Sequence, residues 1–79
     1  MVDALGALCA YVGREWGLSG YRPEEVRTGP MGVFLRVACS DGSRFWVATD
    51  RHACWFVHAE SVESVAMLML ARHDAGRAV

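Results

Sequence analysis

Apolar residues near the start of the chain recur at the spacing of a helix. They form one narrow stripe made of Leu5, Leu8, Cys9, Val12 and Trp16. Asp3 precedes the stripe as a suitable N-cap. Gly17 follows it at the place where a left-handed residue ends many helices, with Leu18 available for the contact that accompanies such a cap. The pattern predicts a helix between Asp3 and Gly17.

A second helical stripe lies near the end of the chain. It is made of Val62, Val65, Ala66, Met69 and Leu70. Ser61 offers an N-cap, and Gly76 is expected to end the helix after about Ala75. Met67 falls on the opposite, polar side of this helix, so we expect its side chain to be exposed.

Three β-rich runs lie between the helices, at residues 33–39, 44–49 and 54–58. Asp41 and Gly42 form a strong hairpin signal between the first two runs, and Arg51 with His52 forms a weaker one before the third. Residues 21–28 contain Pro23 and form either a short edge strand or a loop. The order predicts a small single α+β domain over residues 1–79: helix, edge strand, three-stranded antiparallel meander and helix, with both helices on one sheet face.

The hairpin turns determine which side chains share a face of the sheet. If both turns have two-residue loops, Val37 lies opposite Trp46, and Ala48 lies opposite Trp55. One face is then wholly apolar and receives the helices; it carries Val33, Leu35, Val37, Cys39, Trp46, Ala48, Trp55 and Val57. The other face carries Phe34, Arg36, Ala38, Phe45, Val47, Thr49, Cys54, Phe56 and His58.

The second face is unusually aromatic for an outer face, which is normally polar. Such a patch marks an interaction site unless a helix crosses to cover it or the second turn, at Arg51 and His52, is off by one residue. We therefore expect a non-enzymatic protein-interaction module of inhibitor, immunity or adaptor type, which binds a second copy of itself as a homodimer, another protein, or both. The expected partner-binding residues are Phe34, Arg36, Phe45, Val47, Phe56 and His58.

A small nucleic-acid-binding domain is the alternative function. Sheet aromatics can stack on bases, and Phe34, Phe45 and Phe56 would then act with Arg36 and Arg44. Eight basic residues against nine acidic ones give a net charge of −1, which argues against strong binding to a phosphate backbone.

The residues with catalytic or metal-binding chemistry do not form a recognisable site. Cys54 and His58 are four residues apart on a strand, about 13 Å from each other, and cannot share a metal. His52 and Cys54 supply two ligands, too few for a zinc site. A nucleophilic Cys54 paired with His52 or His58 would lack an orienting group. We expect no catalytic residue, no metal and no cofactor.

Composition adds expectations about the source and the compartment. All the basic residues are arginines, and lysine, asparagine, glutamine and isoleucine are absent, which favours a GC-rich bacterium or its phage. Three cysteines without tight spacing fit reduced thiols in a cytoplasm. Asp3 stands where a secretory signal would be basic. No apolar run approaches the ~20 residues of a membrane span, so no contact with a membrane is expected.

Overall fold

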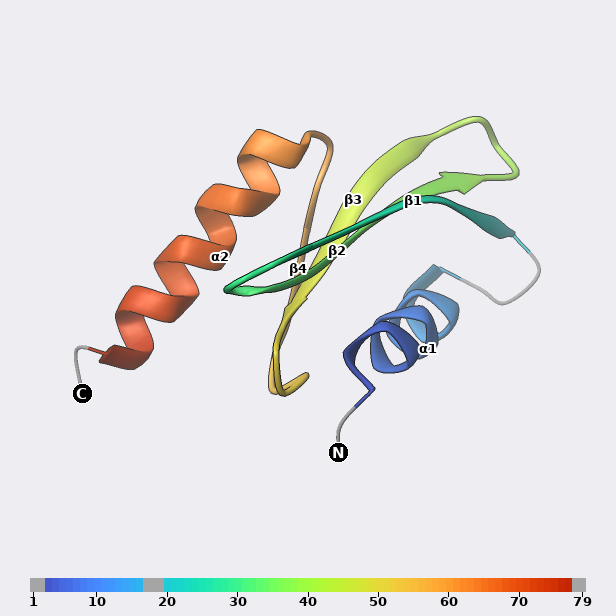
Figure 1. Ribbon diagram of the computed structural model, residues 1–79. Coiled ribbons are helices and arrows are strands. Elements are labelled where there is room, and N and C mark those ends of the chain that lie inside the picture. Colours follow the sequence, from blue (N-terminus) through green and yellow to red (C-terminus); the bar gives the residue numbers. More distant parts are fainter. Residues whose placement is uncertain (1–2, 17–19, 78–79) are drawn as a thin grey trace.

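The computed structural model of the protein describes residues 3–16 and 20–77, with side chains as far as residue 75. Two helices flank a sheet, in the order α1 (Ala4–Trp16), β1 (Tyr21–Gly29), β2 (Gly32–Cys39), β3 (Arg44–Asp50), β4 (Phe56–Ala59) and α2 (Val62–Arg77). The four strands are antiparallel and lie in chain order (Figure 1). The predicted α+β class and single small domain are confirmed.

Local sequence signals place both helix starts. The Asp3 carboxylate accepts the N–H of Gly6 at 3.1 Å, and the Ser61 hydroxyl accepts the N–H of Ser64 at 3.1 Å. Both predicted N-caps are therefore confirmed. The predicted cap at Gly17 and Leu18 lies outside the described residues, and α2 continues through Gly76 to Arg77.

The segment at residues 21–28 is a strand, β1, at the edge of the sheet and longer than expected. Pro23 lies opposite Val37, and Glu25 is the next residue of β1 to have a partner, Arg36. The extra residue is Glu24, which forms a β-bulge. A proline and a bulge are both tolerated at an edge strand, since neither interrupts a central ladder.

The β2–β3 loop has three residues, not two. The Cys39 N–H donates to the Ser43 carbonyl at 2.8 Å, so Ser40, Asp41 and Gly42 form the loop. Gly42 adopts a φ of 92°, which glycine tolerates, and the Asp41 carboxylate accepts the Ser43 N–H at 2.9 Å. This is the common three-residue hairpin, and it also uses an Asp-Gly pair.

One extra loop residue reverses the faces of β3 relative to β2. Val37 lies opposite Phe45, and Leu35 lies opposite Val47, where we expected Trp46 and Ala48. Phe45 and Val47 therefore share a face with Leu35 and Val37. The β3–β4 register differs from expectation by two residues, with Ala48 opposite Val57, so β4 follows β3 without a further change of face.

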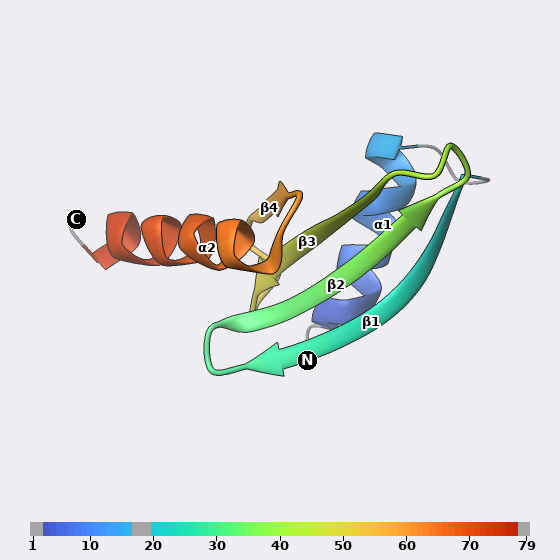
Figure 2. The ribbon, with the colours of Figure 1, turned by 90° about the horizontal axis from the view of Figure 1, so that it is seen from above.

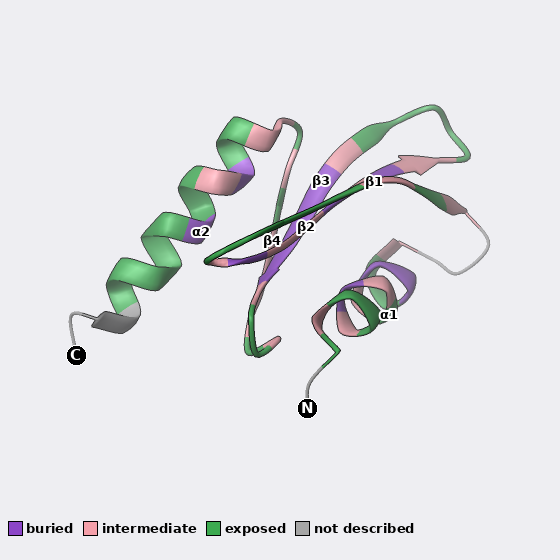
Figure 3. Ribbon diagram, in the orientation of Figure 1, coloured by how far each residue is buried: buried purple, intermediate pink, exposed green. Residues whose placement is uncertain are grey.

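The helices consequently lie on opposite faces of the sheet, and the expectation that both pack on one face is wrong (Figure 1). The α1 side buries Leu8, Val12, Leu35, Val37 and Val47. The α2 side buries Trp46, Ala48, Val65 and Met69. Because each face of the sheet has large apolar residues, each needs its own helix. Figure 3 shows the buried residues concentrated where the sheet meets the helices.

Candidate interaction surfaces

The six predicted partner-binding residues do not share one face. Phe45, Val47, Phe56 and His58 lie on the side of α1, whereas Phe34 and Arg36 lie on the side of α2. The single aromatic outer face is therefore wrong, because it assumed a two-residue loop after Ser40.

Aromatic residues of α1 cover most of the predicted patch. The Tyr11 ring stacks on Phe56 with centroids 4.5 Å apart, and Trp16 lies 4.6 Å from Phe45 and 5.0 Å from His58. Burial, with a smaller effect of Glu15, raises the pKa of the Tyr11 hydroxyl. α1 thus covers the part of the predicted patch that lies on its side of the sheet, whereas Phe34 and Arg36 lie on the other side.

The outer surface of α2 is the largest apolar feature left uncovered on that helix. We use this name for Met67, Leu68 and Leu70, which are 70%, 42% and 50% exposed. Val65 and Met69 of the same helix are fully buried. Met67 is exposed as predicted, but Leu70 was expected in the core and is half exposed.

Leu70 is exposed because the second half of α2 extends beyond the edge of the sheet (Figure 2). Every described side chain of α2 from Leu70 to Ala75 is exposed, and the helix projects away from the sheet when viewed from above (Figure 2). Helical periodicity indicates which residues share a face but not where the supporting sheet ends.

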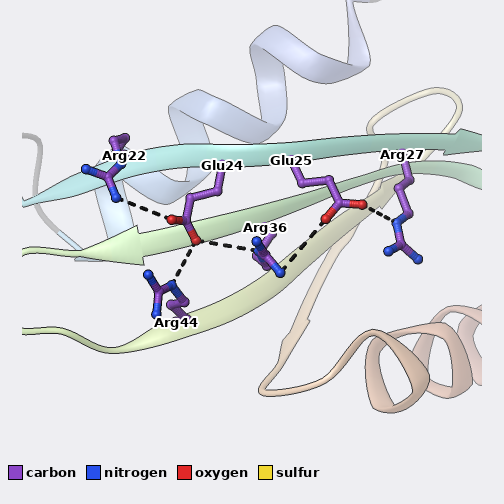
Figure 4. Close-up of polar contacts among 6 residues, drawn as sticks. All are labelled: Arg22, Glu24, Glu25, Arg27, Arg36 and Arg44. Atoms are coloured by element: carbon purple, nitrogen blue, oxygen red, sulfur yellow. Dashed lines mark hydrogen bonds and ion pairs between the residues drawn. The ribbon is translucent and has the colours of Figure 1, made fainter.

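A second surface lies on the part of the same sheet face that α2 leaves open. We call it the arginine face; it consists of Arg22, Arg27, Arg36 and Arg44 with Glu24 and Glu25 between them (Figure 4). The bulge in β1 creates it, because two consecutive glutamates would otherwise point to opposite sides of the sheet. The predicted partner-binding site includes Arg36 of this group, and the nucleic-acid alternative adds Arg44.

Glu24 is the centre of the arginine face. It accepts hydrogen bonds from Arg44 Nε at 3.0 Å and from a terminal nitrogen of Arg22 at 3.3 Å. Arg36 Nε is buried 3.5 Å from the same carboxylate without hydrogen-bond alignment. The bond from Arg44 is the main cause that holds the pKa of Glu24 below its usual range; burial opposes it, and Arg22 and Arg36 reinforce it.

Glu25 likewise contacts two arginines, nearer the β1–β2 turn. It accepts a hydrogen bond from Arg27 Nε at 2.6 Å and lies 3.9 Å from a terminal nitrogen of Arg36. The guanidinium of Arg27 also lies over the ring of Trp46, 5.1 Å from its centroid. Arg27 thus connects the arginine face to the core under α2.

The residues considered for nucleophilic or metal chemistry are dispersed. Cys54 is exposed, and the negative charge of Asp50, followed by burial, raises the pKa of its thiol. A raised pKa reduces the thiolate fraction that a nucleophile needs. Within the described ranges, no three His, Cys, Asp or Glu side chains are placed to hold a metal ion.

Comparisons with protein-family models, curated sequences and solved structures give no match to this chain. No described helix is long and apolar enough to cross a membrane. The exposed surfaces therefore provide the basis for proposing a function.

Proposed function

We propose that the protein is a small, non-enzymatic interaction module that forms a homodimer through the outer surface of α2. The observation that carries this proposal is the exposure of Met67, Leu68 and Leu70 on a helix whose Val65 and Met69 are fully buried. Full burial of one such side chain contributes about 1.5–3 kcal/mol. If a second chain covered α2, burial of these side chains would contribute much of this free energy to the association.

The charge pattern of α2 also supports an apolar contact. Between Glu63 and Arg72 the helix has no charged residue, and these two positions are more than two turns apart. Arg72 turns toward the sheet side, where its guanidinium lies 5.7 Å from the ring centroid of Trp55. Glu63 lies one turn before Met67, and Asp74 lies one turn after Leu70, so a contact centred on Met67 keeps both carboxylates at its rim.

A second copy of the chain is the occupant that we favour. Two-fold pairing places the same patch on both sides of an interface, so one self-complementary patch around Met67, with Leu68 and Leu70 on its two flanks, is sufficient. Met67 and Leu68 supply flexible and branched apolar groups near the centre of such a pair. A role as an inhibitor, immunity protein or adaptor is compatible with this module, and the free Cys9, Cys39 and Cys54 suit a reducing cytoplasm.

Nucleic-acid binding through a phenylalanine platform receives less support. Phe45 and Phe56 contact α1 residues, and Phe34 packs beside the cluster under α2. The three rings do not form one stacking surface.

Light scattering over a concentration series tests the proposed homodimer. We expect the wild-type mass to rise toward that of a dimer between about 1 µM and 1 mM, as mass action requires. Met67→Glu/Leu70→Glu should remain a monomer throughout. Val26→Glu is the matched control, because Val26 is 47% exposed on β1, far along the chain from α2; it should still dimerise. A wild-type protein that is monomeric at every concentration would contradict the proposal.

A further inference from the structure

The arginine face has its cations outside and its carboxylates inside. The side chains of Arg22 and Arg44 are 73% and 62% exposed, whereas that of Glu24 is 15% exposed. An approaching partner therefore meets guanidinium groups first. Figure 4 shows the two glutamates between the four arginines.

This face also differs in charge from the rest of the molecule. Four arginines and two glutamates give it a formal charge of +2, and the whole chain has −1, so the remainder has −3. Positive charge is thus concentrated on one open part of the sheet. Such asymmetry steers an anionic partner toward that part.

The glutamates hold the arginines in place without using all their donors. Within the described residues, the hydrogen bonds of Arg27 and Arg44 to the glutamates use Nε. A guanidinium has five N–H donors, so the terminal amino groups of these two arginines remain available. A paired terminal edge fits a carboxylate in a two-bond arrangement. Because the side chains are already held, a ligand loses less conformational freedom when it binds them.

The strand register places two of the arginines in one row across the sheet, on either side of β2. Arg22 and Arg44 both lie opposite Ala38, one on β1 and the other on β3. Their Cα atoms are therefore about 10 Å apart, two strand spacings. Ala38 has a short side chain, and the Glu24 carboxylate is hydrogen-bonded to both arginines, so the two guanidinium groups form the exposed part of this row.

We propose that the arginine face is a docking surface for a carboxylate-rich protein segment. An acidic peptide fits better than nucleic acid, because the two aromatic rings beside the arginines are covered: Trp46 is 6% exposed beneath Arg27, and Phe34 is half-buried against the cluster under α2. Within the described residues of this face, neither ring offers bases an open stacking platform. The proposal is independent of the dimer through α2, which uses different residues.

Fluorescence anisotropy with a labelled octaglutamate peptide tests this surface. At low ionic strength, about 20 mM, we expect saturable binding below about 1 mM. Arg22→Gln/Arg44→Gln should weaken binding at least about tenfold. Arg14→Gln/Arg51→Gln removes the same charge from exposed positions outside the face and should change binding less than about twofold. Ala38→Glu, which adds a carboxylate between the two arginines, should weaken binding without removing an arginine.

Three results would overturn the proposal. The first is no saturable binding of octaglutamate to the wild type. The second is an equal loss of peptide affinity in Arg22→Gln/Arg44→Gln and in Arg14→Gln/Arg51→Gln, which would indicate that binding responds to net charge alone. The third is tighter binding of a thymidine oligonucleotide of matched charge than of the peptide. Unchanged melting curves for the variants establish that each one is folded.

Discussion

The Tyr11 ring stacks on Phe56 with its plane within 5° of parallel, which fastens α1 to the shortest strand of the sheet. β4 has four residues and lies at the edge of the sheet. A short edge strand has few ladder hydrogen bonds of its own, so side-chain packing contributes much of its stability. The contact between these two rings therefore holds the first helix of the chain against its last strand.

Phe56→Ala is expected to lower the free energy of unfolding by about 2 kcal/mol, less than for a fully buried phenylalanine because the ring is half-buried. In a domain of this size the melting temperature should fall by about 10 °C. A double-mutant cycle with Tyr11→Ala should give a coupling of about 0.5–1.5 kcal/mol. Additive effects of the two substitutions, measured by thermal denaturation, would contradict the stacked geometry.

Phe45→Asp distinguishes a core position from an interface position. The ring centroid of Phe45 lies 4.6 Å from that of Trp16, and Phe45 packs against the cluster under α1. A carboxylate there should cost about 3 kcal/mol or more, since it would be desolvated without a partner. We expect loss of the folded protein in circular dichroism spectra. A folded Phe45→Asp monomer that melts like the wild type would place Phe45 at an interface.

The elements could be predicted from the sequence because their signals are local. Asp3 and Ser61 cap helices with hydrogen bonds that span three residues, and β-rich runs separate at turn residues. The faces of the sheet depend instead on loop length. Asp41 and Gly42 suit two-residue and three-residue hairpins alike, and one residue decides whether Phe45 joins Val37 or opposes it.

The arginine face was missed for a related reason. In a regular strand, Glu24 and Glu25 point to opposite sides, so the sequence does not bring both beside Arg36. The bulge places them together, and a bulge has no fixed sequence signature. One sign was present: four charged residues within six positions around Pro23, typical of an edge strand that avoids pairing with another chain.

Met67→Lys and Met69→Lys form a matched pair on α2. Met67 is 70% exposed and Met69 is fully buried. At concentrations at which the protein is monomeric, Met67→Lys should change stability by less than about 0.5 kcal/mol. Met69→Lys should cost about 3 kcal/mol or more, because it buries an ammonium group beside Val65. Urea denaturation of both variants checks the orientation of α2, and a larger effect at Met67 would contradict it.

Asp50 should make stability depend on acid pH. Burial acts to raise its pKa, but the N–H groups of Cys54, Trp55 and His52 outweigh burial and hold the pKa below its usual range. A lowered folded-state pKa stabilises the protein above the unfolded value of about 3.9, and this contribution is lost as pH falls through the folded value. Asp50→Asn should therefore lower the urea midpoint at pH 7 and have a smaller effect near pH 2. An equal effect at both pH values would show that the charge of Asp50 contributes nothing.

Gly29 and Gly32 lie opposite each other at the β1–β2 turn, yet an alanine should be tolerated at one and not at the other. A Cβ on Gly29 would meet no atom within 4 Å. On Gly32, which has a φ of 156°, a Cβ would overlap the backbone carbonyl of Thr49 and approach Asp50 Cα to 2.9 Å. Backbone atoms of a central strand cannot move aside as a flexible side chain can. Gly32→Ala should thus separate β2 from β3 near Thr49, where the hydroxyl of that residue donates to the Trp55 carbonyl at 2.8 Å.

We expect Gly32→Ala to lower the free energy of unfolding by about 2–3 kcal/mol, whereas Gly29→Ala should stay within about 0.5 kcal/mol of the wild type. Both substitutions remove the same backbone freedom from the unfolded chain, so the difference between them measures the close approach of β2 to β3 together with the strain of an alanine at the φ of 156°. Equilibrium urea denaturation of the two variants gives that difference directly. Equal midpoints would mean that β2 and β3 are farther apart at Gly32 than the pairing of Gly32 with Asp50 requires.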